Sequence, residues 1–325
     1  MKKRWVINFL ITYIVLYNLT FSNLRKENIN KKSLRNQIVY LVNETSPFTG
    51  ELIGEGIKEQ YENGIKNGFF QGFVQDKNEE FMYEGKYING IKHGVWTLKY
   101  LNGDTKGILK YNYDKPNGQW TYFYENKNME GYENLEDGIL HGKVVKYSPI
   151  GELITKVEYY NGLLKGEAVF FYKGEILETL TSFKYGKIDG GIKIFGADGA
   201  QILEGAYKNN NREGLWKFFY KTGDIKTIVN YKNGLKDGEV IIYDKAGLVA
   251  QKSRFIQGNE VDSNGNVLKK EKELKDSIVD RFKKFNRNLK YEKYDKILSE
   301  MEWVKNEKIY IRNYVFFSDF NKLFF

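Results

Sequence analysis

Apolar and polar residues alternate along most of this chain with a period of two. In one stretch Trp96, Leu98 and Tyr100 alternate with Thr97 and Lys99, which is the pattern of a half-buried strand. Segments of about seven residues rich in Tyr, Phe, Ile, Val and Thr follow one another, and these residue types favour strands. A helical period of 3.6 residues does not fit them. The pattern therefore predicts a chain built from short β-strands.

Two kinds of turn signal separate these segments. Asn89-Gly90 recurs as Asn161-Gly162 and Asn233-Gly234, and a second signal is Asn102-Gly103. Asn-Gly between alternating segments favours a two-residue type I′ turn, since both central residues need positive φ. We interpret each repeat as two antiparallel strands.

The segments repeat with a fixed period of 24 residues, shown most clearly by seven glycines: Gly94, Gly118, Gly142, Gly166, Gly190, Gly214 and Gly238. We interpret them as turn residues with positive φ or as points of close backbone approach. Because the period is even, every copy points to the same face of the sheet. One face should carry Trp96, Trp120 and Trp216, with Leu98, Tyr122, Phe170, Ile194, Phe218 and Ile242. The prediction is an all-β repeat array, an elongated antiparallel β-meander of 24-residue hairpin repeats with a short α-helical C-terminal extension.

Composition divides the chain into four parts. Residues 1–22 are a signal peptide or N-terminal membrane anchor, residues 23–45 a linker, residues 46–265 the repeat array, and residues 266–325 a helical tail. In the tail, Leu274, Ile278, Phe282, Phe285 and Leu289 recur at helical spacing, and a second helix is expected around Tyr294. We expect the tail to pack on the open end of the sheet, and a separate partner-binding element is the alternative.

The first residues favour export. Lys2, Lys3 and Arg4 precede an apolar run over residues 5–21, as in a signal peptide. The predicted location is the periplasm, the cell surface or the medium. Anchoring in the inner membrane by residues 5–21, or a soluble amphipathic start, are the alternatives. The chain has no cysteine, which excludes disulfides, thiol catalysis and cysteine metal sites.

The net charge of +9 is concentrated at the ends of the chain. Residues 1–36 carry +7 and residues 266–325 carry +5, which leaves −3 on the repeats. A nucleic-acid-binding protein should show a basic stripe on its folded surface. The charge distribution therefore argues against nucleic acid as a partner, while a membrane surface stays an alternative because of the basic N-terminal segment.

Candidate chemistry is sparse. The two histidines, His93 and His141, occupy the same turn position two repeats apart, too distant on a flat sheet to share a metal ion. The sequence contains no Gly-x-Ser-x-Gly elbow, no His-Glu-x-x-His motif and no Walker-type loop. We therefore expect a protein that is not an enzyme, with no catalytic or metal-ligating residue and no cofactor.

The repeat itself resembles a known family. The pattern Tyr-x-Asn-Gly-x-x-x-Gly-x-Trp-x-x-Tyr-x-x-x-Gly, seen in residues 87–103 and 207–223, is similar to the bacterial MORN-repeat-variant family, and Ser46-Pro-Phe-Thr-Gly50 looks like the opening of such arrays. Members are often labelled YwqK-like antitoxins, and MORN repeats elsewhere act as scaffolds that bind proteins or membranes. The resemblance implies a partner-binding hairpin array without catalytic residues. The expected function is an exported protein–protein interaction scaffold; the alternatives are an antitoxin that binds a cognate toxin and a membrane-surface module.

A second series of aromatic residues lies one position past the Leu98-type residue: Phe123, Tyr147, Phe171, Phe195, Phe219 and Tyr243, with Lys99 as the first copy. By alternation these side chains point away from the tryptophans. If Asn102-Gly103 is a two-residue turn, their cross-strand neighbours are Lys106, Glu130, Ile154, Glu178, Ile202, Lys226 and Ala250. The series is either a cross-strand ladder packed internally or under the C-terminal helices, or the partner-binding stripe.

Overall fold

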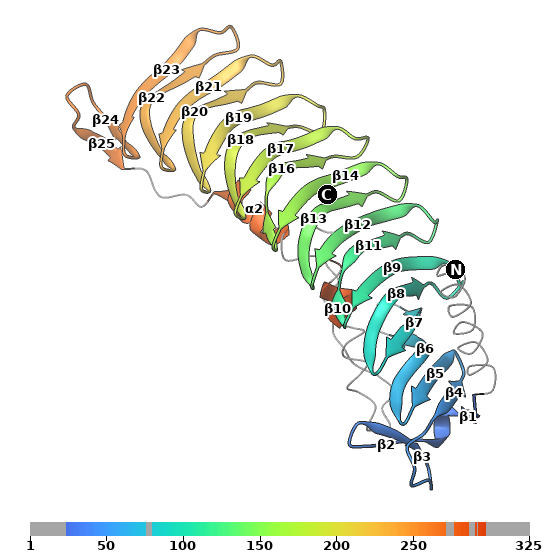
Figure 1. Ribbon diagram of the computed structural model, residues 1–325. Helices are drawn as coiled ribbons and strands as arrows, with labels where there is room; N and C mark the ends of the chain where they lie inside the picture. Colours follow the sequence, from blue (N-terminus) through green and yellow to red (C-terminus); the bar gives the residue numbers. More distant parts are fainter. Residues whose placement is uncertain (1–23, 76–79, 271–275, 286–289, 291, 297–325) are drawn as a thin grey trace, which may run out of the picture. The chain divides into compact units, whose positions relative to one another are not determined.

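The computed structural model describes residues 24–75, 80–270, 276–285, 290 and 292–296. The protein is nearly all β, with 64% strand and 6% helix, and 23 strands belong to its main sheet. The expected all-β array of hairpins is confirmed (Figure 1). The described residues form two compact units, one within residues 24–115 and the other within residues 116–296.

The first unit is a meander preceded by a small hairpin. Each main strand is antiparallel to the next: β4 (Gly50–Gly54), β5 (Ile57–Glu62), β6 (Ile65–Gln75), β7 (Glu80–Ile88), β8 (Ile91–Lys99) and β9 (Thr105–Asn112). Upstream lie β1 (Lys26–Asn28), the 3-10 turn η1 (Ile29–Lys31), β2 (Lys32–Arg35) and β3 (Ile38–Leu41). β1 pairs with β4 in parallel, and β2 pairs with β3.

Residues 23–45, expected to be a linker, are therefore structured over most of their length. Val39 and Leu41 are buried, and the Val39 N–H donates to the Gly64 carbonyl at 2.9 Å. The linker prediction followed from the polar composition of this stretch. It missed β3, whose four residues include the buried Val39 and Leu41.

The second unit is also an antiparallel meander. Its strands are β10 (Lys115–Pro116), β11 (Gly118–Phe123), β12 (Met129–Glu136), β13 (Ile139–Tyr147), β14 (Leu153–Tyr160), β15 (Leu163–Leu164), β16 (Gly166–Phe171), β17 (Leu177–Lys184), β18 (Lys187–Phe195), β19 (Gln201–Lys208), β20 (Asn211–Phe219), β21 (Ile225–Lys232), β22 (Leu235–Tyr243), β23 (Val249–Ile256), β24 (Asn259–Val261) and β25 (Val267–Lys270). One helix follows, α2 (Ser277–Phe285), and residues 290 and 292–296 are also helical.

The two turn signals give different loops. Asn89 and Gly90 have φ of +51° and +82°, the type I′ turn that the sequence predicts. At Asn102-Gly103 only the glycine has positive φ, +89°. Its N–H donates to the Tyr100 carbonyl at 2.9 Å, and the Tyr100 N–H donates to the Asp104 carbonyl at 2.8 Å. The loop therefore has three residues and ends in a bulge, not two residues as expected.

This bulge changes the cross-strand register beside the loop. Leu98 lies opposite Gly107 but Lys99 lies opposite Thr105, so that Lys106 is the extra residue. The same shift recurs in the six later copies. The neighbours predicted for the second aromatic series are therefore wrong. The actual partners are Thr105, Met129, Leu153, Leu177, Gln201, Ile225 and Val249.

The glycines of the 24-residue series all have positive φ, from +70° at Gly214 to +119° at Gly190. They lie within strands and not at hairpin tips. Between β7 and β8 the register shifts between Glu84 and Lys86, opposite the segment that starts at Gly94. The predicted positive φ of these glycines is confirmed. It accompanies a second bulge in the repeat, separate from the one beside the loop.

The tryptophans form the core of the sheet, and we call the side that carries them the tryptophan face. Trp96, Trp120 and Trp216 are each 0% exposed. Trp216 lies edge-on between Tyr207 and Tyr231, with ring centroids 5.1 and 5.8 Å away. These contacts place the repeated aromatic residues on one face, as the even period predicts.

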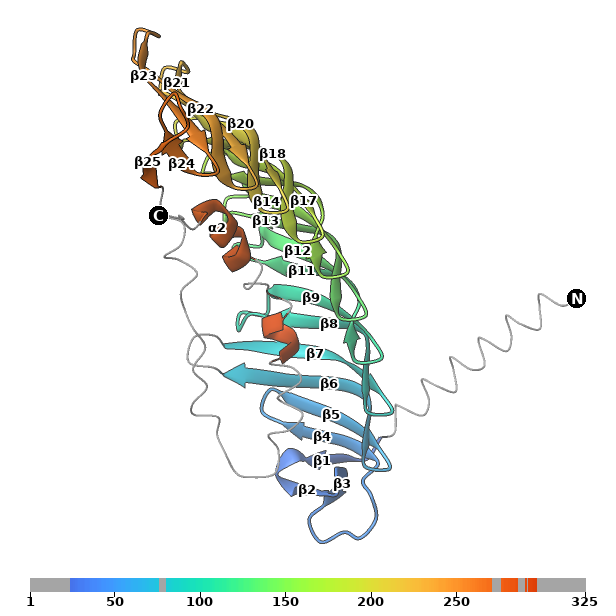
Figure 2. The same ribbon diagram turned by 90° about the vertical axis from the view of Figure 1, so that its left-hand side faces the viewer.

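Helix α2 packs on the tryptophan face of the second unit (Figure 2). The Phe282 ring lies 5.2 Å from the rings of both Phe170 and Phe183. For α2, the expected position on the open end of the sheet is wrong, because Phe282 packs on apolar partners in the middle of the unit. No helix among the described residues is long and apolar enough to cross a membrane. The predicted signal peptide or anchor over residues 1–22 lies outside the described residues, as do residues 297–325 of the tail.

Candidate functional site

The second aromatic series forms a half-buried stripe on the second unit. We call the set Phe123, Tyr147, Phe171, Phe195, Phe219 and Tyr243 the aromatic stripe. Each member is the last residue of its strand and stands at the bulge beside the loop. By alternation along the strand, the side chains point to the face opposite the tryptophans. The series is half-buried in all six of these copies.

The bulge gives the aromatic stripe apolar neighbours. Phe123 pairs with Met129, Phe171 with Leu177 and Phe219 with Ile225. Only Phe195 faces a polar partner, Gln201. The charged neighbours expected from a two-residue turn are absent from these pairs, so the stripe is an apolar ladder with one side open to solvent.

Two tyrosines hold neighbouring members of the stripe in place. Tyr124 Oη donates to the Tyr147 carbonyl at 2.8 Å, and Tyr220 Oη donates to the Tyr243 carbonyl at 2.8 Å. Burial, with a smaller contribution from the charge of Glu130, raises the pKa of Tyr124 to about 12. The hydroxyl is therefore protonated and able to donate across the physiological range.

A depression of about 530 Å³ lies next to the stripe. Its lining includes Gly191, which has no side chain, Ala206 and Ser182, whose side chains are small, and the larger Leu180 and Leu215. Leu215 is 53% exposed. Lys193 and Lys217 also line it, each two residues before a stripe phenylalanine on the same strand. The depression and the stripe therefore share one face.

The rim of this depression carries an ion pair. Lys217 Nζ lies 3.0 Å from Glu204 Oε1. Hydrogen bonds from Lys217 and then from Gln201 lower the pKa of Glu204, so its carboxylate stays ionised. The surface thus combines an apolar floor with charges of both signs, as a protein interface does.

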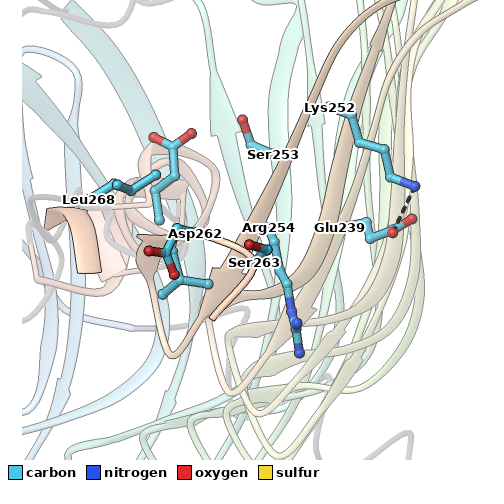
Figure 3. A pocket seen from close by; sticks show the side chains of 9 residues that line it. Glu239, Lys252, Ser253, Arg254, Asp262, Ser263 and Leu268 are labelled. Atoms are coloured by element: carbon cyan, nitrogen blue, oxygen red, sulfur yellow. Dashed lines mark ion pairs between the residues drawn. The ribbon is translucent and has the colours of Figure 1, made fainter. Parts of the chain in front are cut away.

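A second depression, of about 270 Å³, lies between β22 and β25 (Figure 3). It is lined mainly by charged and hydroxyl side chains, and Lys252 Nζ lies 2.8 Å from Glu239 Oε1. Its small and polar lining makes it the weaker candidate.

The histidines lie beside turn tyrosines. The His141 ring is 4.9 Å from that of Tyr160, and its Nδ1 is 3.1 Å from the Glu136 carboxylate. The His93 ring is 5.6 Å from that of Tyr113. Across the described part of the chain, no group of three or more His, Cys, Asp or Glu side chains could hold a metal ion.

On the tryptophan face of the second unit, several polar side chains contact described residues that lie between positions 276 and 296. Arg281 forms an ion pair with Glu178, and Lys290 forms one with Glu130. Asp276 accepts hydrogen bonds from Tyr207 Oη at 2.8 Å and from Arg212 Nε at 3.0 Å.

Sequence reasoning missed these contacts because it placed Glu130 and Glu178 opposite the aromatic stripe. Both are the extra residue of a bulge, and a bulge re-aims its side chain. The available signal was their identical repeat position, two repeats apart.

A half-buried lysine, Lys146, lies near this contact. Burial lowers the pKa of Lys146, and the nearby Glu133 carboxylate opposes that effect. The Lys290 backbone N–H also donates to Glu133, at 3.1 Å. The tryptophan face therefore carries polar as well as aromatic side chains where Lys290 contacts it.

Comparison with known proteins adds no family. No protein-family model matches the chain, and no curated protein matches it.

Proposed function

We propose that this chain is an exported, non-enzymatic repeat protein that acts as a protein–protein interaction scaffold through its MORN-like sheet. The observation that carries the proposal is the aromatic stripe beside the depression on one face of the second unit. Rigid, half-buried aromatic side chains lose little conformational entropy on binding and are common hot spots of interfaces. A partner that inserts an apolar side chain over Gly191 and Ala206 would meet Lys193, Lys217 and Glu204 at the rim.

The test compares partner capture by the wild-type full chain with capture by the double variant Phe171→Ala, Phe195→Ala. A binding stripe predicts loss of about 2 kcal/mol, or roughly 30-fold in affinity, with little change in melting temperature. The matched control is Tyr185→Asn, which removes an aromatic residue that is 75% exposed at a hairpin turn. This control should bind as the wild type does.

Two results would contradict the proposal. One is a double variant that binds the partner as well as the wild type. The other is a melting temperature that collapses, with binding lost only through unfolding, because the stripe would then be core. Capture of a toxic protein whose activity the chain blocks would favour the antitoxin alternative instead.

A further inference from the structure

Residues 276–285, 290 and 292–296, which we call the C-terminal segment, contact the tryptophan face at the same repeat positions twice. Phe282 packs on Phe170, and Tyr294 stacks on Tyr122 with ring centroids 5.6 Å apart. Phe170 and Tyr122 occupy one position of the repeat, 48 residues apart.

The basic residues of the C-terminal segment follow the same rule. Arg281 pairs with Glu178 and Lys290 with Glu130, and these glutamates also stand 48 residues apart at one position of the repeat. Two aromatic residues and two cations of the segment thus use the same two sheet positions, two repeats apart.

Each contact combines an aromatic pair with an ion pair that is partly exposed to solvent. The Glu178 side chain is 8% exposed and the Glu130 side chain 24%, whereas Arg281 is 44% and Lys290 29% exposed. Salt screens such partly exposed pairs. Helix α2 has nine residues, too few to be stable alone in water, so that its order depends on the sheet.

The acidic positions restrict where such a segment can bind. The position of Glu130 and Glu178 is filled by Lys226 two repeats beyond Glu178, while the aromatic position continues as Phe218. A segment with an aromatic residue near a cation therefore meets an aromatic ring and a carboxylate at Tyr122 and Glu130, and again at Phe170 and Glu178. At Phe218 it would meet an aromatic ring but a lysine in place of the carboxylate.

We propose that the tryptophan face of the second unit is a recognition surface for helical protein segments that carry an aromatic residue beside a basic one. The chain's own C-terminal segment occupies this surface as a tethered competitor. A partner segment of the same chemistry must displace it. This surface is distinct from the aromatic stripe, and its test does not depend on the stripe.

The first experiment uses the wild-type full chain and measures amide hydrogen exchange at low and high salt. Residues 277–285 should exchange faster than β16–β19 beneath them. Their exchange rate should be at least about tenfold higher in 0.5 M salt than in 0.05 M salt, since screening weakens the ion pairs. The strands should not respond. If these residues exchange as slowly as the strands at both salt concentrations, they are core and the proposal is wrong.

The second experiment measures binding of a labelled peptide with the sequence of residues 276–296. The full-length variant Arg281→Glu, Lys290→Glu should bind it at least about tenfold more tightly than the wild type, whose tethered segment competes at high effective concentration. Adding Glu130→Lys and Glu178→Lys to that variant should abolish binding. Adding Glu158→Lys and Glu239→Lys on the opposite face instead should leave it unchanged.

A peptide with both charges reversed extends the test. It should bind the full-length variant Glu130→Lys, Glu178→Lys and not the Arg281→Glu, Lys290→Glu variant. Circular dichroism and thermal melting confirm that each variant is folded. The proposal is overturned if the folded Arg281→Glu, Lys290→Glu variant does not bind the original peptide, or if reversing Glu130 and Glu178 does not change its affinity.

Discussion

At the scale of single residues, the tryptophan core depends on glycines that leave room for the indole rings. A Cβ atom at Gly205 would lie 2.3 Å from Trp216 Cδ2, and one at Gly85 would lie 2.2 Å from Trp96 Cδ2. Neither glycine has a φ in the left-handed region. Their requirement is therefore close packing and not backbone conformation.

The matched pair Gly205→Ala and Gly191→Ala tests this packing. We expect Gly205→Ala to lower the free energy of unfolding by about 1–3 kcal/mol, since the indole cannot move without strain. A Cβ atom at Gly191 would meet no heavy atom within 4 Å, and Gly191 has no positive φ. Its replacement should leave stability unchanged or raise it by up to about 1 kcal/mol. Urea unfolding measures both, and equal effects of the two changes would contradict the packing argument.

Tyr124 gives the stability a defined dependence on pH. Its pKa is raised to about 12 in the folded protein, against about 10 in an unfolded chain. The raised pKa makes its full contribution to the free energy of unfolding below pH 10. It is lost as the pH rises from 10 to 12, because the unfolded state releases a proton that the folded state retains.

Tyr124→Phe isolates this effect. At pH 8 the variant should be less stable than the wild type by about 1 kcal/mol, because the hydrogen bond to the Tyr147 carbonyl is lost. The difference should shrink between pH 10 and pH 12 in urea unfolding curves. A difference that stays constant over this range would show that the proton on Tyr124 is not linked to folding.

At the scale of the hairpin, the left-handed turn residues set local stability. Tyr185 has φ of +51° and precedes Gly186, at the position that Asn233 occupies two repeats later with the same φ. Asparagine tolerates the left-handed region better than a bulky aromatic residue does. The aromatic residue at this turn is therefore a strained copy of the repeat.

Exchanging these residue types should have opposite effects. Tyr185→Asn should raise the free energy of unfolding by roughly 1 kcal/mol, and Asn233→Tyr should lower it by a similar amount. Thermal melting of the two variants beside the wild type is the measurement. Shifts of the same sign would refute the assignment of strain to the turn.

The hairpins also show where sequence reasoning ends. The type I′ turn at Asn89-Gly90, the face that carries Trp96 and the strand alternation follow from residue type and an even period. The loop at Asn102-Gly103 does not, because Asn-Gly fits both a two-residue turn and the end of a three-residue loop. That single extra residue moved Glu130 and Glu178 to partners that no local pattern predicts.

At the scale of the whole molecule, the repeat architecture could be predicted and the course of the C-terminal segment could not. The spacing of Phe282 predicts a helix, but its partners Phe170 and Phe183 lie about a hundred residues away in the sequence. Such a contact depends on which of several equivalent repeat positions is free and suitably charged. The binding of a protein partner is likewise a proposal that rests on a surface and not on a motif.

The central claim is that the aromatic stripe contacts a protein partner, and site-specific photo-crosslinking tests it most directly. A photoreactive phenylalanine analogue replaces Phe195 in one full-length chain and Tyr185 in a control chain, and both are irradiated in the presence of the captured partner. The account predicts a covalent adduct with the partner from position 195 and none from position 185. An adduct from position 185 alone, or no adduct from position 195 while the partner is bound, would contradict it.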